Sequence, residues 1–344
     1  MSPHRGPIHP PAHPAASEPE PDQGRRDFLR RAATVGLGLA ATGLAGWGLH
    51  DPLGPTQSEP LGPAATLPDY SLPELQGRLA VVHGSSRTAC LRAGLEALGG
   101  IGRIIAPGDR VLIKVNAGFA TPPAQGATTH PELLAELAGL CRQAGAVSVS
   151  VTDNPINDPL SCFQLTGLGQ AADAAGARLW LPEPRYFSPV TVPGARFIRH
   201  WPVLTAPLAG VNKVIGVSPV KDHHRSGASL SMKNWYGLMG GRRNVFHQDI
   251  HSIIAELALM LRPSLVVLDG VVSMISNGPT GGSPDDLKAT ETMILATDPV
   301  AADARAALLL DKAPADLPFI AKAEALGLGT ANWQSLRPGE VRVG

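Results

Sequence analysis

Short apolar runs alternate with longer segments of helical periodicity from about Leu67 to the end of the chain. Several runs are continuous in Val, Ile and Leu instead of alternating with polar residues, which is typical of strands covered on both faces. The pattern predicts strands over residues 79–84, 110–116, 147–154, 177–183, 212–219, 264–275 and 291–299. It predicts helices over residues 88–98, 131–144, 169–175, 245–261, 300–310 and 316–326.

Strands that alternate with helices indicate an α/β fold with a largely parallel, mixed sheet and helices on both faces. We expect residues 71–344 to form this α/β domain, as one body or as two lobes. Ligands of such sheets bind beyond the carboxyl ends of the strands. Polar residues after an apolar run are therefore candidates, although a strand-end Asp is also a common cap or turn former. They are Asn116, Asp153, Asn154, residues 221–225 and Asp269.

The first seventy residues have a different composition. Residues 1–24 are rich in Pro, His, Ala and Glu, which predicts a disordered lead. Residues 50–70 resemble a Pro- and Gly-rich linker. Between them, residues 25–49 contain "RRDFLRR" followed by the uncharged run "AATVGLGLAATGLAGWGL".

Paired arginines, a Phe-Leu and a weakly apolar run resemble the twin-arginine export signal. The alternative is an ordinary membrane helix, but a run of about 18 residues is at the lower limit for spanning a bilayer. We therefore expect export to the periplasm or the outer face of the inner membrane, with the twin-arginine translocation machinery as a partner. If the segment is not cleaved, it would stay as an N-terminal membrane anchor.

Charge and cysteine content exclude some classes of protein. The chain has 29 basic and 29 acidic side chains, so its global charge does not indicate a nucleic-acid partner. Its three cysteines, Cys90, Cys141 and Cys162, are widely spaced and odd in number. They form neither a metal knuckle nor a disulfide framework, which makes an iron–sulfur cluster held by this chain an unlikely cofactor.

Four histidines lie close together in the sequence between residues 223 and 251. His247 and His251 are four residues apart in "HQDIH", which would place both imidazoles on one face of the predicted helix. With His223 or His224 as a third ligand from the preceding loop, they could hold a divalent metal ion, and the expected set is His223, His247 and His251. Gln248 stands where zinc peptidases have Glu, so peptidase chemistry is not supported. The alternative is that these histidines cap the backbone or bind substrate through hydrogen bonds.

Basic residues in the same region are candidates for binding an anion. Lys233 is flanked by Trp235 and Tyr236, so it could be partly buried with a lowered pKa, or could hold a carboxylate or phosphate. An exposed lysine with a buried stem is the ordinary alternative. The Gly-rich stretch "MGGRRN" places Arg242 and Arg243 just before the predicted helix, where an anion could bind.

The order of several segments resembles the family called domain of unknown function 362. They are "VLIKVN", "TTHPELL", "VKDHH", "SLSMKNWYGLMGGRRNVFH", "LVVLDGVVSMISNGPTGG" and "ATDPVAADA", and the resemblance covers residues 79–310. The family pattern generally has Lys-Pro-Asn where this chain has Lys114-Val115-Asn116. The resemblance implies a fold and a set of polar positions, but no reaction. The matching positions are Lys114, Asn116, Asp153, His223, Lys233, Asn234, His247, Asp269 and Asp303.

A second likeness concerns His223, Lys233 and His247. Their order is similar to that of the residues with which lactate-racemase-type enzymes hold a nickel-pincer nucleotide and move a proton at a hydroxy-acid carbon. This is an analogy of residue order alone.

We therefore expect an enzyme-like site that binds a metal or an anionic cofactor, with redox or isomerase-type chemistry. Its predicted catalytic residues are His223, Lys233 and Asp153. Its predicted cofactor-binding residues are Lys114, Asn116, Asn234, Arg242, Arg243 and Asp269. The competing function is a non-catalytic periplasmic binding protein or an electron-transfer accessory protein.

Overall fold

The computed structural model describes residues 23–48 and 64–344, which fall into two units, Met1–Gly54 and Pro55–Gly344. Most of the predicted disordered lead and linker lies outside the described residues. In the first unit, α1 (Gln23–Gly48) is a single helix that contains the paired arginines, and the described side chains between residues 26 and 38 are exposed. Among the described residues, no helix has both the length and the apolar character needed to cross a membrane.

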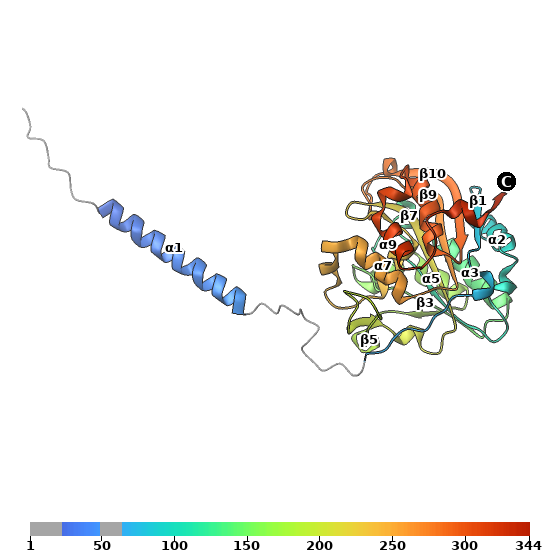
Figure 1. The fold of residues 1–344 in the computed structure, drawn as a ribbon, viewed down its shortest axis with the longest axis horizontal. Coiled ribbons are helices and arrows are strands. Elements are labelled where there is room, and N and C mark those ends of the chain that lie inside the picture. The colour runs from blue at the N-terminus through green and yellow to red at the C-terminus, as the bar shows by residue number, and fades with distance from the viewer. Residues whose placement is uncertain (1–22, 49–63) are drawn as a thin grey trace, which may run out of the picture. The chain divides into compact units, whose positions relative to one another are not determined.

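The second unit is built on one nine-stranded sheet (Figure 1). Neighbouring strands in its main path are parallel, except that β10 is antiparallel to both of its neighbours, and the short β8 adds to β7 in antiparallel fashion. This confirms the predicted α/β class with a largely parallel, mixed sheet. The order is β11 (Gly339–Arg342), β1 (Leu79–His83), β10 (Leu287–Ala296), β9 (Leu265–Met274), β7 (Lys213–His223), β2 (Arg110–Lys114), β3 (Ser148–Thr152) and β4 (Arg178–Trp180), with β8 (Gly227–Ser229) beside β7.

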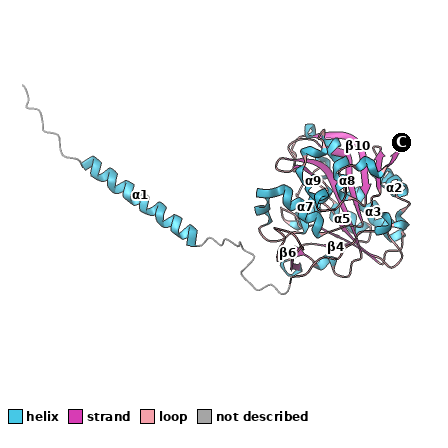
Figure 2. Ribbon diagram, viewed as in Figure 1, coloured by secondary structure: helices cyan, strands magenta, loops and turns pink. Residues whose placement is uncertain are grey.

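Helices cover both faces of this sheet (Figure 2). The central strands are buried on both sides, so consecutive residues of β9 alternate between two hydrophobic cores: Leu265 and Val267 lie in one, Val266 and Leu268 in the other. The first core packs against α2 (Arg87–Ala97), α3 (Pro131–Gln143), α4 (Pro159–Leu165) and α5 (Leu168–Ala174). The second packs against α6 (Ser231–Asn234), α7 (Ile250–Met260), α8 (Pro299–Ala307) and α9 (Pro318–Ala325).

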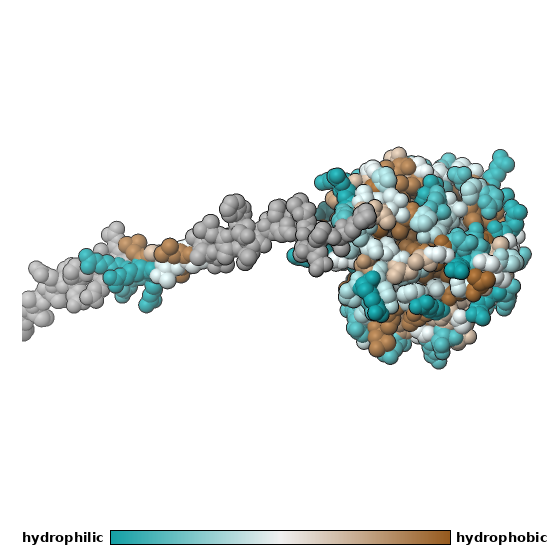
Figure 3. All heavy atoms as spheres, turned by 90° about the horizontal axis from the view of Figure 1, so that it is seen from below, coloured by the Kyte–Doolittle hydropathy of each residue, from teal (hydrophilic) through white to brown (hydrophobic). Residues whose placement is uncertain are grey.

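The unpredicted elements are short or lie at the edges. A separate two-stranded sheet joins β5 (Phe187–Val190) to β6 (Trp201–Leu204), and β11 pairs at the edge beside β1. On the face seen in Figure 3, hydrophobic residues lie in small groups between hydrophilic ones, as is ordinary for a folded domain.

The helix predicted over residues 245–261 begins later than expected. A 3₁₀ segment occupies Arg243–Asp249, and α7 starts at Ile250 because the Asp249 carboxylate accepts a hydrogen bond from the Ser252 N–H. His247 therefore precedes the α-helix that contains His251. The two imidazoles do not share a helical face, and the predicted i, i+4 geometry is wrong.

Candidate functional site

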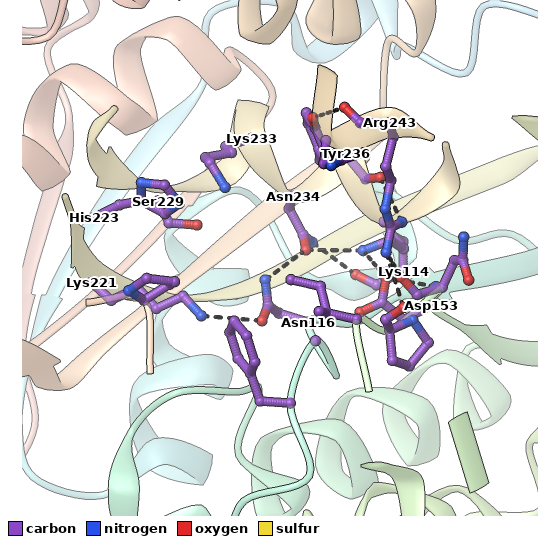
Figure 4. Close-up of a pocket in the computed structure, with 18 of the residues that line it drawn as sticks. Lys114, Asn116, Asp153, Lys221, His223, Ser229, Lys233, Asn234, Tyr236 and Arg243 are labelled. Carbon is purple, nitrogen blue, oxygen red and sulfur yellow. Dashed lines mark hydrogen bonds and ion pairs between the residues drawn. The ribbon is translucent and has the colours of Figure 1, made fainter. Parts of the chain in front are cut away.

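A cavity of about 330 Å³ lies at the carboxyl edge of β2, β3 and β7 (Figure 4). Because these parallel strands are adjacent, their ends bring residues that are far apart in the sequence to one place. The segment from Ser229 to His247 covers the other side. The cavity brings together eight of the eleven residues predicted as catalytic, cofactor-binding or metal-binding: Lys114, Asn116, Asp153, His223, Lys233, Asn234, Arg243 and His247.

Three of the predicted residues do not line this cavity. Asp269 is within β9 and forms an ion pair with Arg87, with 2.7 Å between its Oδ2 and the arginine Nε. Arg242 is exposed. The ring of His251 stacks with that of Phe319 at a centroid distance of 6.2 Å. Asp269 thus pairs with a residue of α2, and His251 packs against a residue of α9.

A buried ion pair forms one end of the site. Lys114 Nζ lies 2.8 Å from Asp153 Oδ1, and both side chains are almost completely buried. The ammonium also donates hydrogen bonds to the Val115 carbonyl at 2.6 Å and to Asn234 Oδ1 at 3.0 Å. Burial lowers the pKa of Lys114, whereas the Asp153 carboxylate acts in the opposite direction. The charge of Lys114 is therefore compensated within the protein.

Asn234 connects the strands below the cavity. Its Nδ2 donates to the carbonyl oxygens of Lys114 and Val217, both at 3.2 Å, and its Oδ1 accepts from Lys114 Nζ and from Asn116 Nδ2. All four hydrogen bonds run to β2, to the residues just after it, or to β7. Asn234 therefore fixes the short helix α6, and with it the neighbouring Lys233, over the ends of these strands.

Two further lysines, Lys221 and Lys233, place charge in the cavity, and neither forms an ion pair with a carboxylate in the described part of the chain. Lys221 is 1% exposed and donates to the Ala127 carbonyl and to Asn116 Oδ1. Burial, together with repulsion from Lys233, lowers the pKa of Lys221 to about 7. Burial and the charges of Arg243 and Lys114 lower the pKa of Lys233 to about 8.

The ammonium of Lys233 forms no hydrogen bond or ion pair with any residue that the structure describes, whereas its backbone carbonyl accepts from the Trp235 N–H. Its ammonium lies 5.4 Å from the ring centroid of Tyr236. Figure 4 shows Lys233, Lys221 and His223 toward one side of the cavity, and Lys114, Asp153 and Arg243 toward the other. The uncompensated charge is thus on the side of Lys233.

Arg243 joins two loops at the far side of the cavity. Its Nη1 donates to the carbonyl oxygens of Tyr236 and Met239, at 3.1 and 3.0 Å. Its Nη2 donates to those of Asn154 and Pro155, at 2.8 and 2.9 Å. These bonds occupy the forked end of the guanidinium. Arg243 therefore supplies positive charge and holds the loops, but these N–H groups are not free to bind the anion expected at Arg242 and Arg243.

Comparison with known families places this site in context. Residues 111–307 match the family described as Domain of unknown function (DUF362). The chain belongs to this family. The match contains the ends of β2, β3 and β7 and the whole segment from Ser229 to His247. Every residue named above as lining the cavity is within the DUF362 region.

The DUF362 chain is similar to one curated relative and to solved structures. It is 29% identical over 261 residues to a thylakoid-associated protein of Synechocystis sp., covering 71% of this chain and 76% of the relative. It aligns with lactate racemase apoprotein from Thermoanaerobacterium thermosaccharolyticum at 11% identity and a TM-score of 0.37, covering 70% and 58% of the two chains. A Thermotoga maritima protein aligns at 10% identity and a TM-score of 0.31, covering 54% and 50%. The chain thus spans less than two thirds of either solved structure.

The histidines of this DUF362 protein do not fit the predicted metal site. His223 Nδ1 accepts hydrogen bonds from the backbone N–H groups of Arg225 at 3.2 Å and Ser226 at 3.3 Å, so the ring proton is on Nε2. A metal ion at Nε2 would need that proton to move to Nδ1, where it would meet both donors. Within residues 23–48 and 64–344, no group of three or more His, Cys, Asp or Glu is placed to hold a metal ion.

Two further residues of the site, Lys221 and Tyr236, have no role assigned to them by the sequence analysis. Lys221 follows the apolar run of β7 directly, and its position at a strand end was the signal that marked it as a candidate. Tyr236 donates to the Arg243 carbonyl and lies 3.3 Å from His247 Nδ1. No pattern distinguishes Tyr236 from the aromatic residue beside it, Trp235, which is buried in the core.

Proposed function

We propose that the cavity is an enzyme active site that binds a small organic anion and exchanges a proton with it. The observation that carries the proposal is an excess of positive charge. Lys114, Lys221, Lys233 and Arg243 line the cavity, and Asp153 is the one carboxylate among the described lining residues. Like charges in a buried site raise its free energy, and a bound anion would lower it.

The charges that remain available indicate where the anion would bind. Lys114 is paired with Asp153, and the forked end of Arg243 is bonded to carbonyl groups. Lys221 and Lys233 have no carboxylate partner among the described residues, so the anion is expected between them. A cavity of about 330 Å³ suits a small ligand with few atoms beyond its charged group.

Proton exchange is supported by the state of the two lysines. Their pKa values of about 7 and about 8 allow the amines of Lys221 and Lys233 to gain or lose a proton near neutral pH. A general base works best when its pKa is close to the working pH. This distinguishes the proposed enzyme from an accessory protein that binds an anion or an electron carrier without changing it.

The test is titration calorimetry of the purified protein with inorganic phosphate at pH 7. We expect binding, and we expect Lys221→Met and Lys233→Met to weaken it at least tenfold. Lys288→Met is the matched control. Lys288 is a half-exposed residue of β10 that pairs with Asp311 and does not line the cavity. Absence of phosphate binding, or equal affinity in all variants, would refute the proposal.

We also propose that the protein is exported through the twin-arginine route, on the basis of Arg25 and Arg26 ahead of a weakly apolar run. The translocation machinery would then be a partner, and the protein would work in the periplasm or on the outer face of the membrane. Changing both arginines to lysine should retain the protein in the cytoplasm when cells are fractionated. Unchanged distribution would oppose this route.

A further inference from the structure

His223 differs from the other histidines in the way its ring is held. His223 is 3% exposed and is the last residue of β7, where the chain turns toward β8. Nδ1 accepts two N–H groups of that turn, from Arg225 and Ser226. Nε2 makes no hydrogen bond with any described residue, and His223 lines the cavity. The turn therefore fixes one tautomer, with an N–H group left for a ligand.

The surroundings of His223 also keep its ring neutral. Burial and the charges of Lys233 and Lys221 lower the pKa of His223 to about 2. The rings of His224 and His247 stack with that of His223, at centroid distances of 5.0 and 6.2 Å. A second proton would have to enter at Nδ1, against the two backbone donors. His223 therefore acts as a hydrogen-bond donor and not as a base.

A neutral imidazole N–H suits an oxygen atom that gains negative charge during a reaction. A preorganised donor stabilises charge that develops in the transition state more than charge already present in the substrate. A neutral histidine polarises the substrate carbonyl in this way in triosephosphate isomerase. An oxygen that becomes negative when a neighbouring carbon loses a proton is the carbonyl oxygen of an enolisable compound.

We propose that the ligand is a small 2-oxo carboxylate and that His223 Nε2–H is a catalytic donor to its carbonyl oxygen. This rests on the proposed function, since the carboxylate would occupy the anion position between Lys221 and Lys233, with Lys221 as its charged partner. Lys233, whose ammonium has no hydrogen-bond or ion-pair partner among the described residues, is the base for the C–H group.

The reaction step is an enolisation. Lys233 Nζ, as the neutral amine, takes the proton from the carbon next to the carbonyl, and the C–H electron pair forms a carbon–carbon double bond. The carbonyl π electrons move to the oxygen, where the His223 N–H stabilises the enolate. Return of the proton from the Lys233 ammonium completes an exchange or an isomerisation. Atoms and electrons balance without an oxidant or reductant.

The test is hydrogen–deuterium exchange at C3 of 2-oxobutanoate in D₂O, followed by proton NMR. Wild-type protein should exchange this position at least tenfold faster than buffer. His223→Phe and Lys233→Met should abolish the increase, and Lys288→Met should not change it. His223→Gln should keep part of it, because the amide oxygen can accept from the turn while the NH₂ group donates to the ligand.

The outcomes separate this inference from the proposed function. Phosphate binding without exchange would overturn the enolisation and leave anion binding in place. Exchange that persists in His223→Phe would overturn the role of His223. If the wild-type protein neither binds phosphate nor accelerates the exchange, both proposals are overturned. Circular dichroism of each variant checks that it is folded.

Nitrogen NMR of histidine-labelled protein gives a test that needs no substrate. We expect His223 to remain the neutral Nε2–H tautomer between pH 5 and 9, whereas an ordinary histidine titrates at a pKa of about 6.5. A proton on Nδ1, or titration of His223 near that value, would overturn the inference.

Discussion

Gly237 lies directly against Asp153, so closely that a Cβ atom at residue 237 would overlap the carboxylate Oδ1 and stand 2.7 Å from Lys114 Nζ. The buried ion pair thus depends on a position that has no side chain. We predict that Gly237→Ala destabilises the protein by about 1–3 kcal/mol, the usual cost of overpacking a well-packed interior, and weakens phosphate binding. Chemical denaturation and calorimetry would measure the two effects.

The matched control for this change is Gly139→Ala. Gly139 is in α3, and nothing lies within 4 Å of the Cβ that would be added. Since Ala has a higher helix propensity than Gly, this substitution should be neutral or stabilising by up to about 1 kcal/mol. Equal effects of the two substitutions would show that crowding at Asp153 is not the cause.

The Lys114–Asp153 pair should respond strongly to removal of one partner. Asp153→Asn leaves the Lys114 ammonium buried without its carboxylate, and breaking such a pair typically costs about 3–5 kcal/mol. The double variant Lys114→Met/Asp153→Asn should recover part of this loss, because no unpaired charge remains. Denaturant unfolding of the two single variants and the double variant measures the coupling. Additive losses would contradict the interpretation of a coupled buried pair.

The free energy of unfolding of the ligand-free protein should rise with pH between the folded and the ordinary pKa of Lys221. The pKa of Lys221 is about 7 in the folded protein against an ordinary value of 10.5. Between these values the unfolded chain binds more protons than the folded one, so the free energy of unfolding increases as pH increases. One pKa unit corresponds to about 1.4 kcal/mol, which makes the expected rise a few kcal/mol at most.

The pH prediction is checked by comparing Lys221→Met with the wild type from pH 7 to 10. The rise attributed to Lys221 should disappear in the variant, and saturating phosphate should reduce it in the wild type because the anion favours the charged amine. A pH profile that is the same in both proteins would contradict the prediction.

The central sheet was predictable because its strands are buried on both faces. Runs such as those of β2 and β9 must be continuous in Val, Ile and Leu, and this alone marks them in the sequence. The ends of adjacent parallel strands lie together, so Lys114 and Asp153 could be assigned to one site before any contact was known. The short α6 and the edge strand β11 have no such signal.

The errors at Asp269 and His251 have local causes. β9 continues five residues past Asp269 to Met274, so this carboxylate is within the strand and pairs with Arg87. His251 follows the cap at Asp249, which separates it from His247. The role of Lys221 could not be decided from the sequence, because its low exposure depends on the Ala127 carbonyl and Asn116, both distant in the chain.

Asp303 should act on the site through the backbone of α6. Its carboxylate is completely buried and accepts from Ser231 N–H at 2.9 Å, Ser231 Oγ at 2.5 Å and Met232 N–H at 3.1 Å. Asp303→Asn places an NH₂ group against one of these donors, which should cost about 1–3 kcal/mol of stability. It should also weaken phosphate binding, since α6 carries Lys233.

The matched control is Asp311→Asn. The Asp311 carboxylate is 73% exposed and pairs with Lys288, so this substitution is expected to cause no measurable loss of stability. The positioning role is separated from a purely structural one by measuring phosphate affinity at a temperature where both variants are fully folded. If Asp303→Asn is less stable but binds phosphate as tightly as the wild type, α6 does not need this carboxylate to hold Lys233 in the cavity.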